Sequence, residues 1–177
     1  MNPTKRRLIG QLADQVRNEL KLGIPVDVHS AVKKVGGSII IAPVGDMVCE
    51  AAARKADNNK FEIRLREGAS VERERFSVAH ELGHLFLHMG FQTDEGRWEK
   101  VPVGESSERA RYGVSESEYE VNEFAAALLM PEDHFRHAID ELAVDDKIDM
   151  SMVADRFGVS VSAARLRGQW LDLISWD

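Results

Sequence analysis

The sequence predicts an α+β fold in which a small three-stranded antiparallel sheet packs against helices. Three short apolar runs follow one another at residues 38–44, 47–53 and 60–65, separated by turn-forming Gly-Asp and Asp-Asn pairs. Segments with apolar residues at helical spacing lie on both sides of these runs. A chain of 177 residues with 44% hydrophobic residues is long enough for one domain with a real core.

The N-terminal segment is expected to form two helices. Apolar residues recur every four positions at Leu8, Leu12, Val16 and Leu20, after an Asn-Pro-Thr start that suits a helix N-terminus. Pro25 separates this helix from a short second one, which a Gly-Gly pair closes.

The strand-like runs are short and their connections are tight, which favours an antiparallel meander. Cys49 is the single cysteine and lies in the second run. One cysteine excludes an intramolecular disulfide, so we interpret it as a small buried apolar side chain.

The central part of the chain is expected to hold a long helix and then a loop. Ser70 is placed to cap a helix that runs to about His88, with Gly90 as its stop. Residues 92–115 are polar and lack apolar periodicity, so they predict a long loop or lid anchored by Trp98.

The C-terminal third is expected to be helical. A helix over 116–130 ends at Pro131, and another follows it. Residues 150–174 form two helical halves around the sequence FGVS, a pattern that resembles a helix-turn-helix. We therefore divide the chain into residues 1–143 and a C-terminal helical segment at 144–177.

Charge and hydropathy narrow the classes of function. A net charge of −7 and a pI near 5.4 argue against nucleic-acid binding through a basic surface. From Ser151 to Asp177 three arginines face three aspartates, so this segment is expected to pack or to contact protein, and we do not expect direct DNA binding. The sequence shows neither a signal peptide nor a transmembrane stretch, so a cytoplasmic location is expected.

One motif carries recognisable chemistry, the sequence AHELGH at residues 79–84. His80 and His84 are one helical turn apart, so both imidazoles can reach one metal ion. Glu81 is turned about 100° away from His80, too far to be a third ligand but close enough to reach a water on that ion. This is the HExxH arrangement, in which two neutral imidazoles bind zinc and the glutamate serves as a base.

The alternative is an accidental match in a helix that is buried on most sides. A chance match in such a chain is on the order of 1%, and buried histidines would still need polar partners. We therefore favour a metal site. His88 lies roughly 12 Å along the helix from His80, so we interpret it as a packed residue or as a partner of a ligand.

The third ligand is expected to come from another helix. A metzincin would place a glycine and then a histidine after His84, where this chain has Leu87 and Gly90. The remaining candidate for the third ligand is a carboxylate from the helix over residues 116–130. The candidates there are Glu116, Glu118, Glu120 and Glu123.

Two motifs together resemble the ImmA/IrrE family of metallo-endopeptidases. They are RERFSVAHELGHLFLH at 73–88 and ESEYEVNEFAAALLMPED at 116–133, with a weaker match in VADRFGVSVSAARLR at 153–167. The resemblance implies a gluzincin-like zinc peptidase of bacteria or their mobile elements. Members of the family typically cleave a separate helix-turn-helix repressor and so release phage, mobile-element or stress genes.

Carried over by motif, the resemblance implies that His80, His84 and Glu118 bind zinc and that Glu81 is the catalytic base. Helical phase favours the same third ligand, because Glu118 lies almost opposite the other three glutamates, whose stripe we interpret as the solvated face. A carboxylate in the apolar arc is costly unless it is paired or binds a metal.

Asn122, one turn after Glu118, could hydrogen-bond a zinc-bound imidazole. The alternative is a buried Glu118 that pairs with Arg73 or Arg75.

The sequence thus supports a zinc-dependent endopeptidase that hydrolyses a peptide bond in a cytosolic protein. The donor for the oxyanion stays open among His134, His137, Tyr112, Tyr119 and nearby arginines. The alternative function is a regulatory protein that binds a partner repressor and holds a structural zinc, but such a site gains nothing from Glu81.

Overall fold

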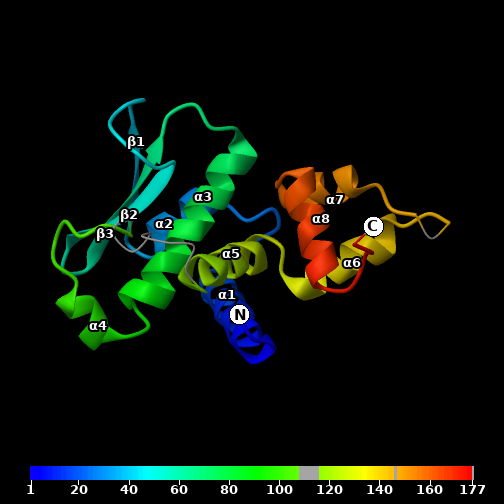
Figure 1. The fold of residues 1–177 in the computed structure, drawn as a ribbon, viewed down its shortest axis with the longest axis horizontal. Helices are drawn as coiled ribbons and strands as arrows, with labels where there is room; N and C mark the ends of the chain where they lie inside the picture. Colours follow the sequence, from blue (N-terminus) through cyan, green and yellow to red (C-terminus); the bar gives the residue numbers. More distant parts are fainter. Residues whose placement is uncertain (108–115, 146, 177) are drawn as a thin grey trace.

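The computed structural model describes residues 1–107, 116–145 and 147–176. A three-stranded sheet lies at one end of the molecule with helices packed beside it, and the C-terminal helices form a group on the other side of a central helix (Figure 1). Among the described residues, none of the helices combines the length and the apolar character needed to cross a bilayer. In chain order the elements are α1 (Pro3–Glu19), α2 (Val28–Lys34), β1 (Ser38–Ala42), β2 (Ala51–Asp57), β3 (Lys60–Arg66), α3 (Val71–Gly83), η1 (His84–Met89), α4 (Glu95–Lys100), α5 (Glu116–Leu129), α6 (Glu132–Leu142), α7 (Met150–Phe157) and α8 (Val161–Trp170).

The sheet is mixed, so the expected antiparallel meander is wrong. The strand order is β1-β3-β2, with β1 parallel to β3 and β2 antiparallel to β3. The connection over residues 43–50 carries the chain across the sheet, so that β3 returns between the other two strands. Phe61, Ile63 and Leu65 alternate along β3 and are buried, which suits a central strand.

The second strand begins at Ala51, four residues later than expected. Val48 is 99% exposed, and Cys49 is only half-buried, in a turn where its thiol donates to the Ala51 carbonyl. The strand instead extends through charged residues. The fold can bury one of them, Lys55, because its ammonium donates to the Trp98 carbonyl at 2.8 Å.

The segment expected to be a long loop is partly regular. It begins with α4, and Trp98 on that helix is buried, which confirms it as an anchor. Residues 104–107 then run along the outer edge of β2, where Lys55 donates to Glu105 at 3.0 Å and accepts from Gly104 at 2.8 Å. The rest of the expected loop, residues 108–115, lies outside the described residues.

The predicted apolar stripe of α1 faces the core except at its first residue. Val16 is buried, and Leu12 and Leu20 are partly buried and pack against the core, whereas Leu8 is 56% exposed. Ile9 and Ala13, which the four-residue repeat does not include, are buried as well, because a strict repeat of four drifts around an α-helix.

Helix α5 is the centre of the fold and packs against both α1 and α3 (Figure 1). Its side towards α1 carries Glu120 and Glu123, which we had assigned to the solvated face. That interpretation is wrong: their side chains are 12% and 11% exposed and form ion pairs with Lys5 and Arg6 of α1. These two glutamates are covered because the first turns of α1 supply opposite charges, whereas Glu116, the third member of the stripe, has a side chain that is 60% exposed.

The pair α7 and α8 has the expected helix-turn-helix-like turn. Helix α7 ends at Gly158 with a φ of 62°, and the Ser160 side chain caps α8 by accepting from Ala163. Phe157 stacks on Phe135 of α6 at 5.4 Å between ring centroids. One apolar cluster runs from the sheet through α5 to these helices, and the division at residue 143 stays a prediction.

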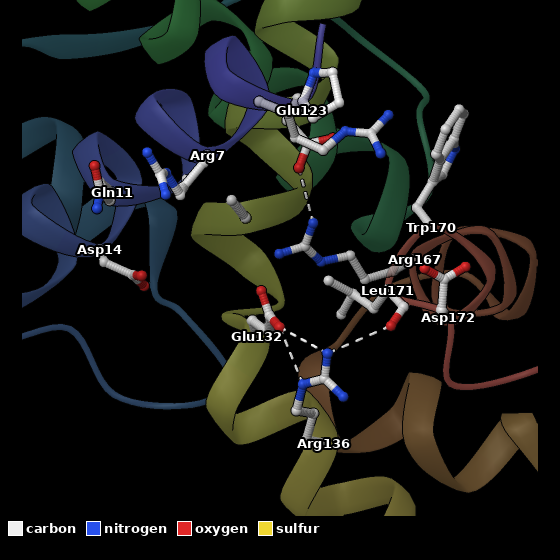
Figure 2. A pocket seen from close by; sticks show the side chains of 14 residues that line it. Arg7, Gln11, Asp14, Glu123, Glu132, Arg136, Arg167, Trp170, Leu171 and Asp172 are labelled. Atoms are coloured by element: carbon white, nitrogen blue, oxygen red, sulfur yellow. Dashed lines mark hydrogen bonds and ion pairs between the residues drawn. The ribbon is translucent and has the colours of Figure 1, made fainter.

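A buried ion pair joins α8 to α5, beside a cavity of about 360 Å³ (Figure 2). Arg167 is 6% exposed and donates to Glu123 at 2.9 Å and to the Met130 carbonyl at 3.1 Å. At the exposed side of this cavity, Arg136 joins Glu132 to the Leu171 carbonyl. Removing one partner of a buried pair costs about 3–5 kcal/mol, so loss of either Arg167 or Glu123 is expected to destabilise the contact of α8 with α5.

Candidate metal centre

The HExxH histidines lie on a helix that changes from α to π geometry between them. Helix α3 ends at Gly83, and the π-helix His84–Met89 continues it until Gly90, which has a φ of 80°. The Ser70 side chain caps the start by accepting from Arg73, as predicted. Turns of π-helix are rare and frequently occur at functional sites.

The structure brings together the three side chains that the sequence proposed as ligands, His80, His84 and Glu118. The Nε2 atoms of His80 and His84 are 3.2 Å apart. The Glu118 carboxylate oxygens lie 3.4 Å from Nε2 of His80 and 3.5 Å from Nε2 of His84. Ligand atoms about 2.0–2.1 Å from a tetrahedral zinc are spaced about 3.3 Å from one another. These side chains therefore already have the spacing of a zinc site.

The hydrogen bonds of the imidazoles determine which nitrogens carry protons. His80 Nδ1 lies 3.0 Å from Asn122 Oδ1, so His80 donates from Nδ1 and presents a lone pair at Nε2. His88 Nε2 faces the Glu120 carboxylate at 3.4 Å, so a neutral His88 accepts at Nδ1 from Nδ1 of His84 at 3.1 Å. His84 then also presents a lone pair at Nε2. Two lone pairs beside a carboxylate need a cation between them.

The Glu118 carboxylate gives a second reason for a metal. Its Oε1 is buried, and no hydrogen-bond partner reaches it among the described residues. The two arginines considered as partners are engaged elsewhere, Arg73 with Glu50 at 2.7 Å and Arg75 with the Gly158 carbonyl at 2.8 Å. An unpaired buried oxygen is costly, so the residues fit a metal ion, and two imidazoles with one carboxylate suit zinc.

Glu81 lies on the same helix and is fully buried. Its Oε2 accepts from the Ala53 backbone N–H at 2.9 Å and from the Ser107 hydroxyl at 2.7 Å. These donors come from β2 and from the segment along its edge, and together they hold the carboxylate in one orientation. Sequence reasoning missed both, because one is a backbone group and the other lies 26 residues away in a polar stretch.

Glu120 extends the contacts of the centre to α1. It bonds His88 on one side and Lys5 on the other. Burial raises the pKa of Glu120, but the hydrogen bonds of Lys5 and His88 and the charge of Lys5 outweigh burial, so this pKa lies below its ordinary value of 4.5. A carboxylate that orients a ligand histidine is common around zinc. Here His88 lies between the Glu120 carboxylate and the histidine His84. The assignment of Glu120 to the solvated face did not predict this connection.

The candidate oxyanion donors are widely separated. Tyr119 follows Glu118 on α5 and is 58% exposed. His134 and His137 lie on α6, where both are exposed. Tyr112 lies outside the described residues.

The fold and the site together define a class of protein. An HExxH helix packed on a small sheet, with a carboxylate supplied by a second long helix, brings together side chains that can hold a metal ion. Residues 38–168 match the family described as the IrrE N-terminal-like domain, Peptidase_M78. The chain therefore belongs to the ImmA/IrrE family of metallopeptidases, as the motifs predicted.

A solved structure with a similar fold is described as a Mycobacterium tuberculosis transcriptional regulator. The TM-score is 0.62 at 16% sequence identity, over 92% of this chain and 46% of that one. At this identity the likeness shows a shared fold, and this chain spans less than half the length of that protein. Among curated proteins no match was found.

Proposed function

We propose that the chain is a zinc-dependent endopeptidase of the cytoplasm that cleaves a helix-turn-helix transcriptional repressor and so relieves repression of phage, mobile-element or stress genes. The observation that carries the proposal is the cluster of His80, His84 and Glu118: the two Nε2 atoms are 3.2 Å apart, and each lies within 3.5 Å of one oxygen of the Glu118 carboxylate. Three protein ligands leave the fourth position of a tetrahedral zinc for water, which is the mark of a catalytic site.

The residues around the cluster have distinct roles in this proposal. Zinc bound there would polarise the scissile carbonyl and lower the pKa of its water. Glu81 accepts the proton of the attacking water and passes it to the leaving amine. Because Ala53 and Ser107 hold one oxygen of Glu81, the carboxylate keeps the same orientation through both transfers. Asn122 keeps the His80 imidazole turned towards the metal.

The choice of a repressor as substrate rests on the family rather than on the geometry. The structural neighbour described as a transcriptional regulator is consistent with this choice. The test is to incubate the zinc-loaded protein with repressors encoded beside its gene and to identify fragments by mass spectrometry. We expect one specific cut, which Glu81→Gln abolishes while zinc stays bound.

Two outcomes would contradict the proposal. Cutting of unrelated proteins with every neighbouring repressor left intact would refute the substrate. The other outcome is that the wild type and Glu81→Gln relieve repression equally well and that neither protein cuts the repressor. In that case the alternative, a binding protein with a structural zinc, would hold.

A further inference from the structure

A groove of about 1060 Å³ lies beside the candidate metal centre, between α3, α5 and α8. One face of α5 forms its length, through Tyr119, Asn122, Ala126 and Met130. From Tyr119 to Met130 the rise along the helix is about 16 Å. The C-terminal helix α8 also lines the groove, through Leu166 and Trp170 among others.

The groove is continuous with the metal centre. Asn122, which lines it, is the hydrogen-bond partner of His80 at 3.0 Å. Phe76 also lines it, and its ring lies 6.5 Å from the His80 ring. Tyr119 directly follows Glu118 in the chain. A polypeptide that passes the metal on the His80 side therefore enters this groove.

The walls of the groove are suited to apolar side chains. Tyr119, Leu166 and Trp170 line it and are 58%, 49% and 46% exposed. Exposed apolar side chains gathered in one concave surface mark a binding site.

The arginines of the groove are paired with carboxylates. Arg6 and Arg167 share Glu123, and Arg73 binds Glu50. Because Arg6 and Arg167 share a single carboxylate, these pairs balance two of the three arginine charges.

We propose that this groove receives the polypeptide substrate on one side of the scissile bond and selects large apolar side chains there. The inference rests on the proposed peptidase function and deepens it. About 16 Å corresponds to about five residues of extended chain at roughly 3.3 Å each. The volume of about 1060 Å³ lies just above the range of about 300–1,000 Å³ typical of small-molecule sites, which suits several side chains. Helix α8 acts here as a wall of the substrate site, consistent with the balanced charge of its segment.

Two substitutions on α8 separate a groove effect from a general one. Leu166→Glu places a charge in the groove. Val161→Glu makes the same kind of change on the same helix, at a side chain that is 43% exposed and does not line the groove. Both sites are exposed, so neither substitution opens a cavity in the core.

The probe is a library of random dodecapeptides, used in two ways. The zinc-loaded wild type, Leu166→Glu and Val161→Glu proteins are incubated with the library, and the cut sites are determined by mass spectrometry. Separately, immobilised Glu81→Gln protein, with and without Leu166→Glu, is used to select bound peptides, which needs no turnover.

We expect enrichment of Leu, Ile, Met or Phe on one side of the cut and in the selected peptides. Leu166→Glu should lower cleavage of the enriched peptides by about tenfold or more, the scale of a lost apolar subsite contact, while Val161→Glu leaves it unchanged. Cleavage without an apolar preference, or a profile that Leu166→Glu leaves intact, overturns this inference and leaves the peptidase function standing. Selection of apolar peptides that depends on Leu166, without any cleavage, supports the groove and refutes the peptidase function. If the protein neither cleaves nor selects peptides, both the groove proposal and the peptidase function are refuted.

Discussion

Replacing Gly83 by alanine is expected to weaken zinc binding, although alanine is the better helix former. Helical propensity alone favours the alanine by about 1 kcal/mol. At this position, however, a Cβ would lie 3.1 Å from Val121 Cβ, 3.2 Å from Val121 Cα and 3.3 Å from Phe124 Cδ1. Ordinary contacts of a Cβ begin at 3.4 Å, so α5 has to move away from α3 by a few tenths of an ångström.

This displacement reaches the metal centre because Glu118 is on α5, one turn before Val121. A zinc site tolerates changes in ligand distance of about 0.2 Å. We therefore expect Gly83→Ala to lower zinc affinity by about tenfold or more, as loss of supporting contacts around a metal does. Overpacking costs about 1–3 kcal/mol, so the free energy of unfolding of the metal-free protein should fall by about 0–2 kcal/mol after the gain in propensity.

The matched control is Gly10→Ala on α1, where a new Cβ would meet nothing within 4 Å. It should raise the free energy of unfolding by up to about 1 kcal/mol and leave zinc affinity unchanged. The assays are urea unfolding of the metal-free proteins and competition for zinc with a chromophoric chelator. Wild-type zinc affinity in Gly83→Ala would refute the claim that the close approach of α3 and α5 sets the ligand geometry.

Three further substitutions test the surroundings of the metal. Glu118→Ala should lower zinc affinity by more than about 100-fold, beyond the usual loss for an outer partner, and an unchanged affinity in the chelator assay would exclude Glu118 as a ligand. Glu120→Gln should lower zinc affinity by about tenfold, because Glu120 acts on the ligand His84 through His88. The pKa of Glu120 is lower in the folded protein than its ordinary value of 4.5. The contribution of the Glu120 carboxylate to stability should therefore be present above pH 4.5 and be lost as the pH falls through the lower pKa of the folded state. A difference in unfolding free energy between Glu120→Gln and wild type that persists unchanged at low pH would contradict this. Ser107→Ala should lower kcat/KM by about tenfold, the scale of one hydrogen bond to a charged group, and a parallel loss of zinc would argue against a role confined to Glu81.

The features of the fold and of the site that the sequence could predict depend on residues that lie close together in the chain. His80, Glu81 and His84 share one helix, so helical spacing alone places them. Helix ends were predictable for the same reason, since Ser70 and Gly158 act on their own neighbours. Glu118 could be singled out because it interrupts an apolar arc.

The parts that sequence reasoning missed depend on contacts between distant segments. Local turn signals cannot tell which strand occupies the middle of the sheet, so the parallel pairing of β1 with β3 was not foreseen. Glu120 was assigned to solvent because Lys5, its partner, lies at the other end of the sequence. The close packing of Gly83 on α3 against Val121 on α5 was likewise not foreseen, because the two residues lie on different helices.

The most direct test of the central claim is X-ray absorption spectroscopy of the zinc-loaded protein. The account predicts about one zinc per chain with two imidazole nitrogens at about 2.0–2.1 Å, one carboxylate, and a water oxygen in the remaining position. Glu81→Gln should give the same spectrum, because Glu81 is not a ligand. Absence of bound metal, or a zinc closed by four protein ligands, would contradict the assignment of this chain as a metallopeptidase with an open catalytic site.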